Sequence, residues 1–140
     1  MKKTADIEVR LLRRAKRGDM IRLYKDAGWW EPEYSRNSSF LDNIVKDSYC
    51  FAAAFHKKEM VGMGRALSDG CSDAYIQDVV VLKKFRGNGI GAEIIKAIIS
   101  HLHSNKIDWI GLIAQPGTES FYKELGFRRM KKHIPMKLAD

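Results

Sequence analysis

Residues 79–92 read VVVLKKFRGNGIGA. The run opens with four consecutive apolar residues, which is typical of a strand buried on both faces, and it closes on three alternating glycines. Directly afterwards, apolar side chains recur at helical spacing from Ile90 to Leu102, which predicts a helix with one buried face. A buried strand, a glycine turn and an amphipathic helix in this order favour an α/β domain.

The glycine turn has the composition of an anion-binding site. Glycine leaves backbone N–H groups accessible, and the first turn of a helix adds unpaired N–H groups and a positive dipole end. Arg86, at the entrance to the turn, adds a positive charge suited to a phosphate. The alternative is a tight connection that binds nothing.

The pattern outside this unit predicts further strands and helices on both sides. Upstream, a strand at 7–12 precedes a helix over 20–27 that ends at Gly28, and Ser39 with Asp42 resembles a capping box that opens a second helix. Strands follow at 49–55, 60–67 and 74–82. Downstream we expect a strand at 107–114, a short helix after Pro116 that stops at Gly126, and final strand material at Phe127 and 134–138.

Together these elements predict a single domain over residues 1–140, of mixed α/β (α+β) class. The order is β-α-α-β-β-β-α-β-α-β, with a mainly antiparallel first half. The β-α units of the second half should place the strands at 74–82 and 107–114 side by side and parallel.

Composition excludes several classes of protein. The chain has 140 residues, of which 45% are hydrophobic and 30% charged, so it is neither globally disordered nor a membrane protein. The start of the chain does not resemble a signal peptide. Its two cysteines, Cys50 and Cys71, are not spaced as metal ligands. We therefore expect a cytoplasmic protein without a metal ion and without a membrane partner.

Positive charge is concentrated near the two ends of the sequence. Lys and Arg number 25 against 17 Asp and Glu, a net charge of +8, and the excess lies in residues 2–17 and 123–137. Such a field attracts nucleic acid, anionic lipid or a phosphorylated cofactor. It is equally consistent with charges that only keep the protein in solution.

A dinucleotide-binding site is one interpretation of the glycines. Gly87, Gly89 and Ala92 satisfy the pattern G-x-G-x-x-A, and Asp108 follows downstream. However, residues 83–86 separate the strand from the first glycine, whereas a dinucleotide fold runs almost directly into it. Too few residues follow for the remaining parallel strands. This interpretation is disfavoured.

A second interpretation fits better. Arg86-x-x-Gly89-x-Gly91 resembles the R/Q-x-x-G-x-G/A motif with which the GNAT N-acyltransferase superfamily grips the pyrophosphate of acetyl-CoA. Residues 121–127, FYKELGF, are similar to the second signature of that superfamily, about 35 residues further on. The resemblance extends from about residue 5 to residue 138. It implies a central, mixed, mostly antiparallel sheet of six to seven strands, flanked by about four helices and splayed between 74–82 and 107–114.

The resemblance also implies the residues that bind acetyl-CoA, the co-substrate. The pantetheine arm would pair with the strand backbone, and a backbone N–H near Val80 would polarise the thioester carbonyl. Gln115 departs from the Asn usual in the family. The implied contacts are Val79, Val80, Val81, Arg86, Gly87, Asn88, Gly89, Ile90, Gly91, Ala92 and Gln115.

For catalysis, the resemblance implies that Tyr122 is the general acid that protonates the departing thiolate. Family members often carry a base near the positions of Tyr75 and Gln77, but neither residue is a base at neutral pH. We expect a proton path through water that these two residues orient. Asp78 should point to the opposite face unless a bulge turns it.

The acceptor is expected to be a small-molecule primary amine. Trp29 and Trp30, with neighbouring carboxylates, suit an amine with an apolar or aromatic body, although they could equally cover the core. The rival function is a non-catalytic GNAT-fold module whose basic ends bind nucleic acid. That rival is disfavoured because the basic segments contain almost no aromatic residues. A homodimer is left open.

Overall fold

A computed structural model describes residues 6–140, so the first residues of the basic segment 2–17 lie outside the described part. Within it, five strands form one sheet in the order β1-β2-β3-β4-β5. The strands are β1 (Ile7–Leu11), β2 (Cys50–His56), β3 (Glu59–Ser68), β4 (Asp73–Val81) and β5 (Trp109–Gly111). The first four pair antiparallel, and β5 pairs parallel to β4.

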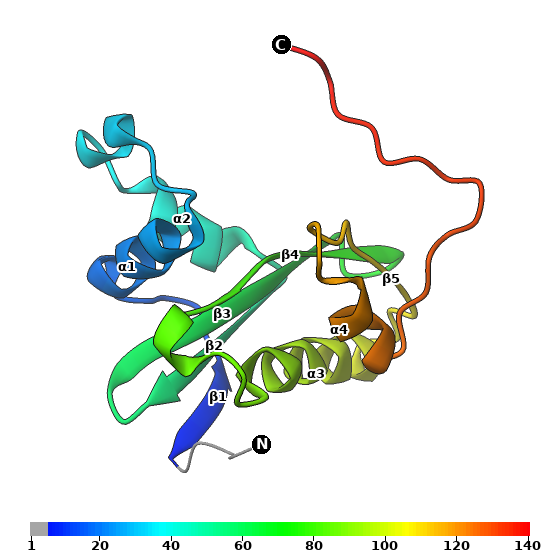
Figure 1. Cartoon of the computed structure of the whole chain (residues 1–140), viewed down its shortest axis with the longest axis horizontal. Helices are drawn as coiled ribbons and strands as arrows, with labels where there is room; N and C mark the ends of the chain where they lie inside the picture. The colour runs from blue at the N-terminus through cyan, green and yellow to red at the C-terminus, as the bar shows by residue number, and fades with distance from the viewer. Residues whose placement is uncertain (1–5) are drawn as a thin grey trace.

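Helices cover both faces of this sheet (Figure 1). One face carries α1 (Arg17–Ala27) and α2 (Phe40–Asp47), with the 3-10 turn η1 (Pro32–Ser35) between them. The other face carries α3 (Ile90–Ser104) and α4 (Glu119–Glu124). The 3-10 turn η2 (Lys83–Phe85) leads from β4 toward α3. We call the two sides the α1 face and the α3 face.

The long helix α3 packs closely on the middle of the sheet because β3 contains two glycines. A Cβ atom on Gly62 would stand 2.9 Å from Ile94, and one on Gly64 would stand 3.0 Å from the same side chain. Ile94 and Ile98 are fully buried at this contact. The missing side chains of β3 therefore set how near α3 lies to the sheet.

Most of the predicted elements are confirmed, but their details differ in two places. The helix at Phe40 forms, yet Ser39 makes no side-chain cap hydrogen bond, and Asp42 instead pairs with Arg17. The capping-box interpretation was therefore wrong. The predicted strand over 107–114 pairs only through Trp109–Gly111, because its ladder with β4 ends after three residue pairs.

The expected six to seven strands are also corrected to five within residues 6–140. Phe127 and the 134–138 segment were predicted to supply the last strand, but residues 127–140 contain no strand. Residues 128–140 are all exposed and run away from the sheet (Figure 1). An extended segment becomes a strand only when a partner edge accepts its backbone hydrogen bonds, and here the segment has none.

Candidate active site

The glycine turn lies at the start of α3 and is held open by backbone conformation. Gly87 and Gly89 both have a φ of 78°, which favours glycine, and nothing lies within 4 Å of where their Cβ atoms would stand. Asn88 closes the turn, since its Nδ2 donates to the carbonyl oxygens of Phe85 and Arg86 at 2.9 and 3.2 Å. The result is a turn with open space beside its first two glycines, at a helix N-terminus.

The helix itself supplies hydrogen-bond donors at this turn. The first intrahelical bond runs from the Glu93 N–H to the Gly89 carbonyl at 3.1 Å, which leaves the N–H groups before Glu93 without an intrahelical acceptor. Those groups belong to Ile90, Gly91 and Ala92. Because α3 has 15 residues, its dipole adds a positive end at the same place.

Arg86 braces the turn against the preceding strand. Its Nε donates to the Val81 carbonyl at 2.9 Å, and its Nη2 lies 4.0 Å from a carboxylate oxygen of Asp26. Half of the side chain is exposed, so its positive charge stays accessible beside the turn. The arginine thus connects the end of β4, the glycine turn and the end of α1.

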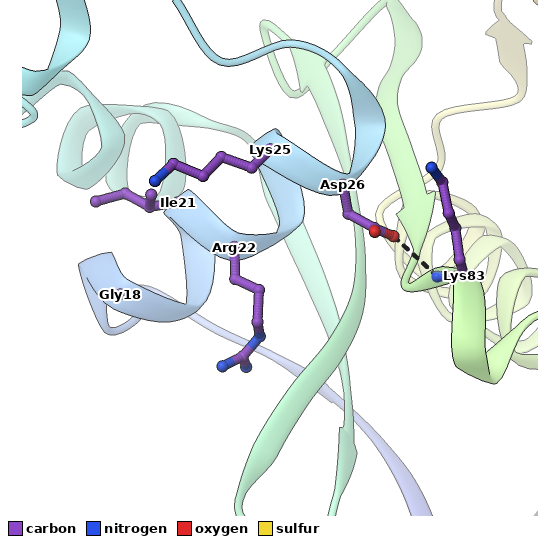
Figure 2. A pocket seen from close by; sticks show the side chains of 6 residues that line it. All are labelled: Gly18, Ile21, Arg22, Lys25, Asp26 and Lys83. Atoms are coloured by element: carbon purple, nitrogen blue, oxygen red, sulfur yellow. Dashed lines mark hydrogen bonds between the residues drawn. The ribbon is translucent and has the colours of Figure 1, made fainter. Parts of the chain in front are cut away.

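A groove of about 560 Å³ lies beside this connection, between α1 and the start of η2 (Figure 2). Asp26 accepts a hydrogen bond from the Lys83 N–H at 2.8 Å, which ties the two elements together (Figure 2). Arg22 donates to Asp19 at 3.0 Å and to the Met60 carbonyl at 3.3 Å. The basic groove therefore borders the glycine turn through Asp26.

The backbone of β4 is free of a strand partner on one side over most of its length. Its parallel ladder with β5 ends at the pair Tyr75 and Gly111, whereas β4 continues to Val81. Val79 and Val81 contact the Cβ positions of Gly64 and Gly62, so they face α3, while Val80 is buried on the α1 face. An extended ligand with amide groups could pair with this open edge.

A β-bulge redirects the polar residues of β4. The register passes from Met63–Val80 to Arg65–Gln77, so β4 has one extra residue between the two pairs. Asp78 absorbs it with a φ of 56°. The structure therefore contains the bulge that is needed to turn Asp78 toward the face of the sheet on which Gln77 lies.

Arg65 brings the two polar side chains of the bulge to one point. Its Nε donates to Asp78 Oδ2 at 2.7 Å, and its Nη2 donates to Gln77 Oε1 at 3.5 Å. Its Nη1 donates to the hydroxyl of Ser48 at 3.4 Å. Both Gln77 and Asp78 therefore lie on the α1 face, together with Tyr75, which is two residues along β4 from Gln77.

Aromatic side chains lie near these polar groups on the α1 face. Tyr24 packs edge-on against Trp29 at 5.5 Å and against Phe40 at 6.4 Å between ring centroids. Trp30 contacts Tyr34, 5.4 Å away, and Lys25 Nζ lies 5.8 Å from the Trp30 ring centre. Both tryptophans remain partly exposed, so they cover the core and also present ring surface to solvent.

The pKa of Tyr24 is affected by the bulge, because its phenol lies near Asp78. Burial, followed by the negative charge of Asp78, raises the pKa of Tyr24 to about 12. Tyr24 thus connects the aromatic cluster of α1 with the Arg65–Asp78 ion pair. Sequence reasoning placed Tyr24 on the apolar face of the first helix and not in the site, and it did not name Arg65, although an Arg and an Asp in neighbouring, mostly apolar strands were a usable signal.

The second signature segment lies against the first. A Cβ on Gly91 would stand 3.2 Å from the Phe121 ring, so α4 packs on the first turn of α3. Tyr122 is half-buried between Phe121 and Phe127, whose ring centroids lie 4.9 and 5.8 Å away. Burial raises the pKa of Tyr122, which keeps its phenol protonated.

Gln115 lies in the connection between β5 and α4. Its carbonyl accepts hydrogen bonds from the Thr118 hydroxyl at 2.7 Å and from the Thr118 N–H at 3.1 Å. Its side chain is exposed.

Among residues 6–140, no three His, Cys, Asp or Glu side chains gather in a way that could hold a metal ion. No helix in the same range is long and apolar enough to cross a membrane.

Comparison with known proteins gives one consistent family. The model of the acetyltransferase (GNAT) domain matches residues 22–137. The uncharacterized N-acetyltransferase ycf52 of Gracilaria tenuistipitata is 34% identical over 109 residues, covering 78% of this chain and 60% of that protein. Acetyltransferase SP0256 of Streptococcus pneumoniae, a GNAT family protein, superposes with a TM-score of 0.78 at 23% identity, covering 96% of this chain and 98% of that one.

Relatives with more specific names differ in what they are said to acetylate. Histone acetyltransferase TAP1 of Glycine max is 31% identical, covering 78% of this chain and 50% of that protein. Serotonin N-acetyltransferase 2, chloroplastic, of Oryza sativa is 34% identical, covering 48% and 34%. The chain thus spans about half the length of the curated relatives it matches. Because one of them is chloroplastic, a cytoplasmic location stays a prediction.

Proposed function

Because the chain belongs to the GNAT acetyltransferase family, we propose that it transfers the acetyl group of acetyl-CoA to a primary amine, by direct attack in a ternary complex. The observation that carries this proposal is the contact between Phe121 and the position of Gly91, which brings the two signature segments together beside the open edge of β4. In this proposal the phosphate site, the free strand edge and the phenol of Tyr122 belong to one site.

The residues present fit acetyl-CoA. The open turn at Gly87 and Gly89 and the free N–H groups of Ile90 to Ala92 suit a pyrophosphate, and Arg86 adds a positive charge. On the side away from β3, the backbone of Val79, Val80 and Val81 has no strand partner and suits the amides of the pantetheine arm, with the Val81 carbonyl already bound by Arg86. The exposed side chain of Gln115, in the connection between β5 and α4, would be a further contact.

The chemistry follows from the same groups. The neutral amine attacks the thioester carbonyl, a C–N bond forms, and the C–S bond breaks as the oxyanion collapses. A backbone N–H near Val80 would stabilise the oxyanion. The departing thiolate takes the proton of Tyr122, a phenol whose pKa burial raises from its ordinary value.

The amine must also lose a proton. The ordered-water path expected past Tyr75 and Gln77 could end at a carboxylate, because Asp78 lies on the same face and shares Arg65 with Gln77. Its carboxylate is therefore the candidate acceptor for the proton that water carries along this path. We therefore add Asp78 to the proposed proton path.

The acceptor we propose is a small amine with an apolar or aromatic body. Trp29 and Trp30 present partly exposed rings on the α1 face, above the same sheet surface as Gln77 and Asp78. Such rings bind cationic amines through their faces. The name of the serotonin N-acetyltransferase relative supports this class, whereas the name of the histone acetyltransferase relative favours a peptide lysine.

The test measures release of free CoA thiol from acetyl-CoA with a panel of arylalkylamines, aliphatic polyamines and a lysine-containing histone-tail peptide. Tyr122→Phe should lower kcat about 100-fold while leaving acetyl-CoA affinity unchanged. Tyr49→Phe is the matched control, because Tyr49 packs on His101 in the last turn of α3, whereas the glycine turn precedes the first turn. Wild-type turnover in Tyr122→Phe would remove Tyr122 from the mechanism, and preference for the peptide would overturn the small-amine proposal.

A further inference from the structure

Arg65 carries a positive charge into a strand that is otherwise mostly apolar. Its side chain is 16% exposed, and its neighbours along β3, Gly64 and Ala66, are both buried. Taking a guanidinium out of water costs free energy, and an apolar side chain at such a position is often as stable as a buried ion pair. Stability alone therefore does not explain an arginine at this place in the sheet.

Each nitrogen of the Arg65 guanidinium binds a different side chain. Nε donates to Asp78 Oδ2 at 2.7 Å, Nη2 donates to Gln77 Oε1 at 3.5 Å, and Nη1 donates to the Ser48 hydroxyl at 3.4 Å. Ser48 is buried and donates to the Ile44 carbonyl, so this third contact fixes the guanidinium to the end of α2. A lysine has a single nitrogen and cannot span the same three partners.

This arrangement decides which atoms of Asp78 and Gln77 remain available. Oδ2 of Asp78 is occupied by Arg65, whereas Oδ1 accepts no hydrogen bond from any residue in the described part of the chain. The Asp78 side chain is 26% exposed, so water can reach Oδ1. Because the Gln77 amide turns its oxygen to the guanidinium, its NH2 group points away from Arg65 and can donate to water.

The same ion pair holds the bulge in β4. Asp78 has a φ of 56°, and a residue other than glycine keeps this conformation only where the surrounding structure holds it. Arg65 pairs with Gln77 in the ladder directly beside the bulge. Its bond to Oδ2 therefore keeps the Asp78 carboxylate on the α1 face.

We propose that Arg65 is a positioning residue for acetyl transfer, which holds the Gln77 amide and the Asp78 carboxylate so that one water molecule bridges them. The water accepts a hydrogen bond from Gln77 Nε2 and donates one to Asp78 Oδ1. As the C–N bond forms, the amine nitrogen gives its proton to this water, and the water gives one of its own to Oδ1. Arg65 acts only through the other two side chains. The proposal rests on the proposed function and on Asp78 in its proton path.

A double-mutant cycle tests whether Arg65 acts through Asp78. Arg65→Lys keeps the charge but loses the three-way contact, so kcat should fall roughly 10-fold while acetyl-CoA affinity stays unchanged. In an Asp78→Asn background, the same substitution should change kcat by less than about 2-fold. Arg17→Lys is the matched control and should turn over as the wild type does, because Arg17 also joins two elements through an aspartate, Asp42, but does so between α1 and α2.

Chemical rescue separates positioning from a purely structural role. Arg65→Ala should lower kcat about 100-fold, and millimolar guanidinium chloride should restore part of the lost turnover without changing the KM for acetyl-CoA. Tetramethylammonium chloride has the same charge but no N–H donor, so it should restore nothing. Urea unfolding checks that each variant is folded. If Arg65→Ala does not fold, the cycle with Arg65→Lys decides the question.

Three results would overturn the positioning role: wild-type turnover in Arg65→Lys, an equal loss in both backgrounds of the cycle, or rescue by both cations. Wild-type kinetics in Asp78→Asn would also overturn it, but would leave acetyl transfer itself intact. If the wild-type protein acetylated no amine at all, the proposed function would be wrong, and the role of Arg65 would be wrong with it.

Discussion

Asp78 adopts a φ of 56° within β4, a conformation that residues other than glycine rarely take. The extra residue of the bulge turns its carboxylate to Arg65, on the face where Gln77 and Tyr75 lie. Backbone strain of this kind persists where the surrounding structure holds it, and it concentrates at functional sites. The bulge thus places a charge where plain strand alternation would not.

Replacing this charge tests its role in the proton path. Asp78→Asn keeps an oxygen that can accept from Arg65 but removes the base, so kcat/KM should fall about 100-fold. The pKa of Tyr24 should also fall, since the charge of Asp78 contributes to its elevation after burial. Steady-state kinetics and ultraviolet pH titration measure the two effects. Asp108→Asn, at an exposed position, is the control, and unchanged kinetics in Asp78→Asn would exclude Asp78 from the path.

Glu119 gives a pH-dependent prediction at the same scale. Hydrogen bonds from Arg129 and then Lys123 lower the pKa of Glu119 from 4.5 to about 2. A lowered folded-state pKa stabilises the fold above the unfolded pKa, and that contribution is lost as the pH falls from about 5 toward 2. The free energy of unfolding of Glu119→Gln should therefore depend less on pH in this window than that of the wild-type protein.

Urea unfolding at pH 7, 4 and 2.5 measures this difference. Glu124→Gln lies on the same helix at an exposed position, and its curve should follow the wild-type curve. If the curve of Glu119→Gln also runs parallel to that of the wild type, the ion pair with Arg129 does not hold the start of the C-terminal segment in solution.

At the scale of elements, the packing of α3 on β3 depends on the absence of side chains at Gly62 and Gly64. A Cβ on Gly62 would meet Ile94 at 2.9 Å and the Val80 carbonyl oxygen at 3.2 Å. The side chain can yield, but the backbone of β4 cannot easily do so. Overpacking at this contact would push α3, and the glycine turn at its start, away from the sheet.

Gly62→Ala should therefore lower the free energy of unfolding by about 1–3 kcal/mol, as measured by urea denaturation. Gly18→Ala is the matched control, because nothing lies within 4 Å of its Cβ position in α1. There the substitution should stabilise the helix by roughly 0.5–1 kcal/mol. If Gly62→Ala were as stable as the wild type, the closeness of α3 would not depend on this glycine.

The sequence predicted elements correctly where the apolar periodicity was long. It failed where a segment becomes a strand only if a partner edge is available. The apolar stripe from Ile90 to Leu102 predicted the helix, and the apolar runs at 49–55 and 60–67 on either side of a polar turn predicted β2 and β3. The expected strand at 134–138 has the right alternation, but strand formation depends on an available edge. The sequence could show only that a bulge would be needed to turn Asp78, not that one is present. One extra residue leaves the apolar pattern on either side unchanged.

At the scale of the whole molecule, the two signature segments predicted the family, and the structure brings them into contact at Gly91 and Phe121. The sequence did not predict the Arg65–Asp78 pair, since it depends on the register of β3 against β4. The positively charged residues behind the net charge of +8 also lie in separate parts of the structure. Arg86 lies at the glycine turn, whereas Arg128, Lys131 and Lys132 lie on the exposed C-terminal segment.

Binding of acetyl-CoA at the glycine turn is tested most directly by titration calorimetry, with NAD and a short DNA duplex as control ligands. Acetyl-CoA alone should bind, with a dissociation constant on the order of micromolar, and Arg86→Glu should weaken binding at least about 10-fold by placing a carboxylate beside the phosphates. Lys46→Glu, at the end of α2, should bind as the wild type does. No binding of acetyl-CoA, with salt-sensitive binding of the duplex instead, would contradict an acetyltransferase and favour the nucleic-acid module.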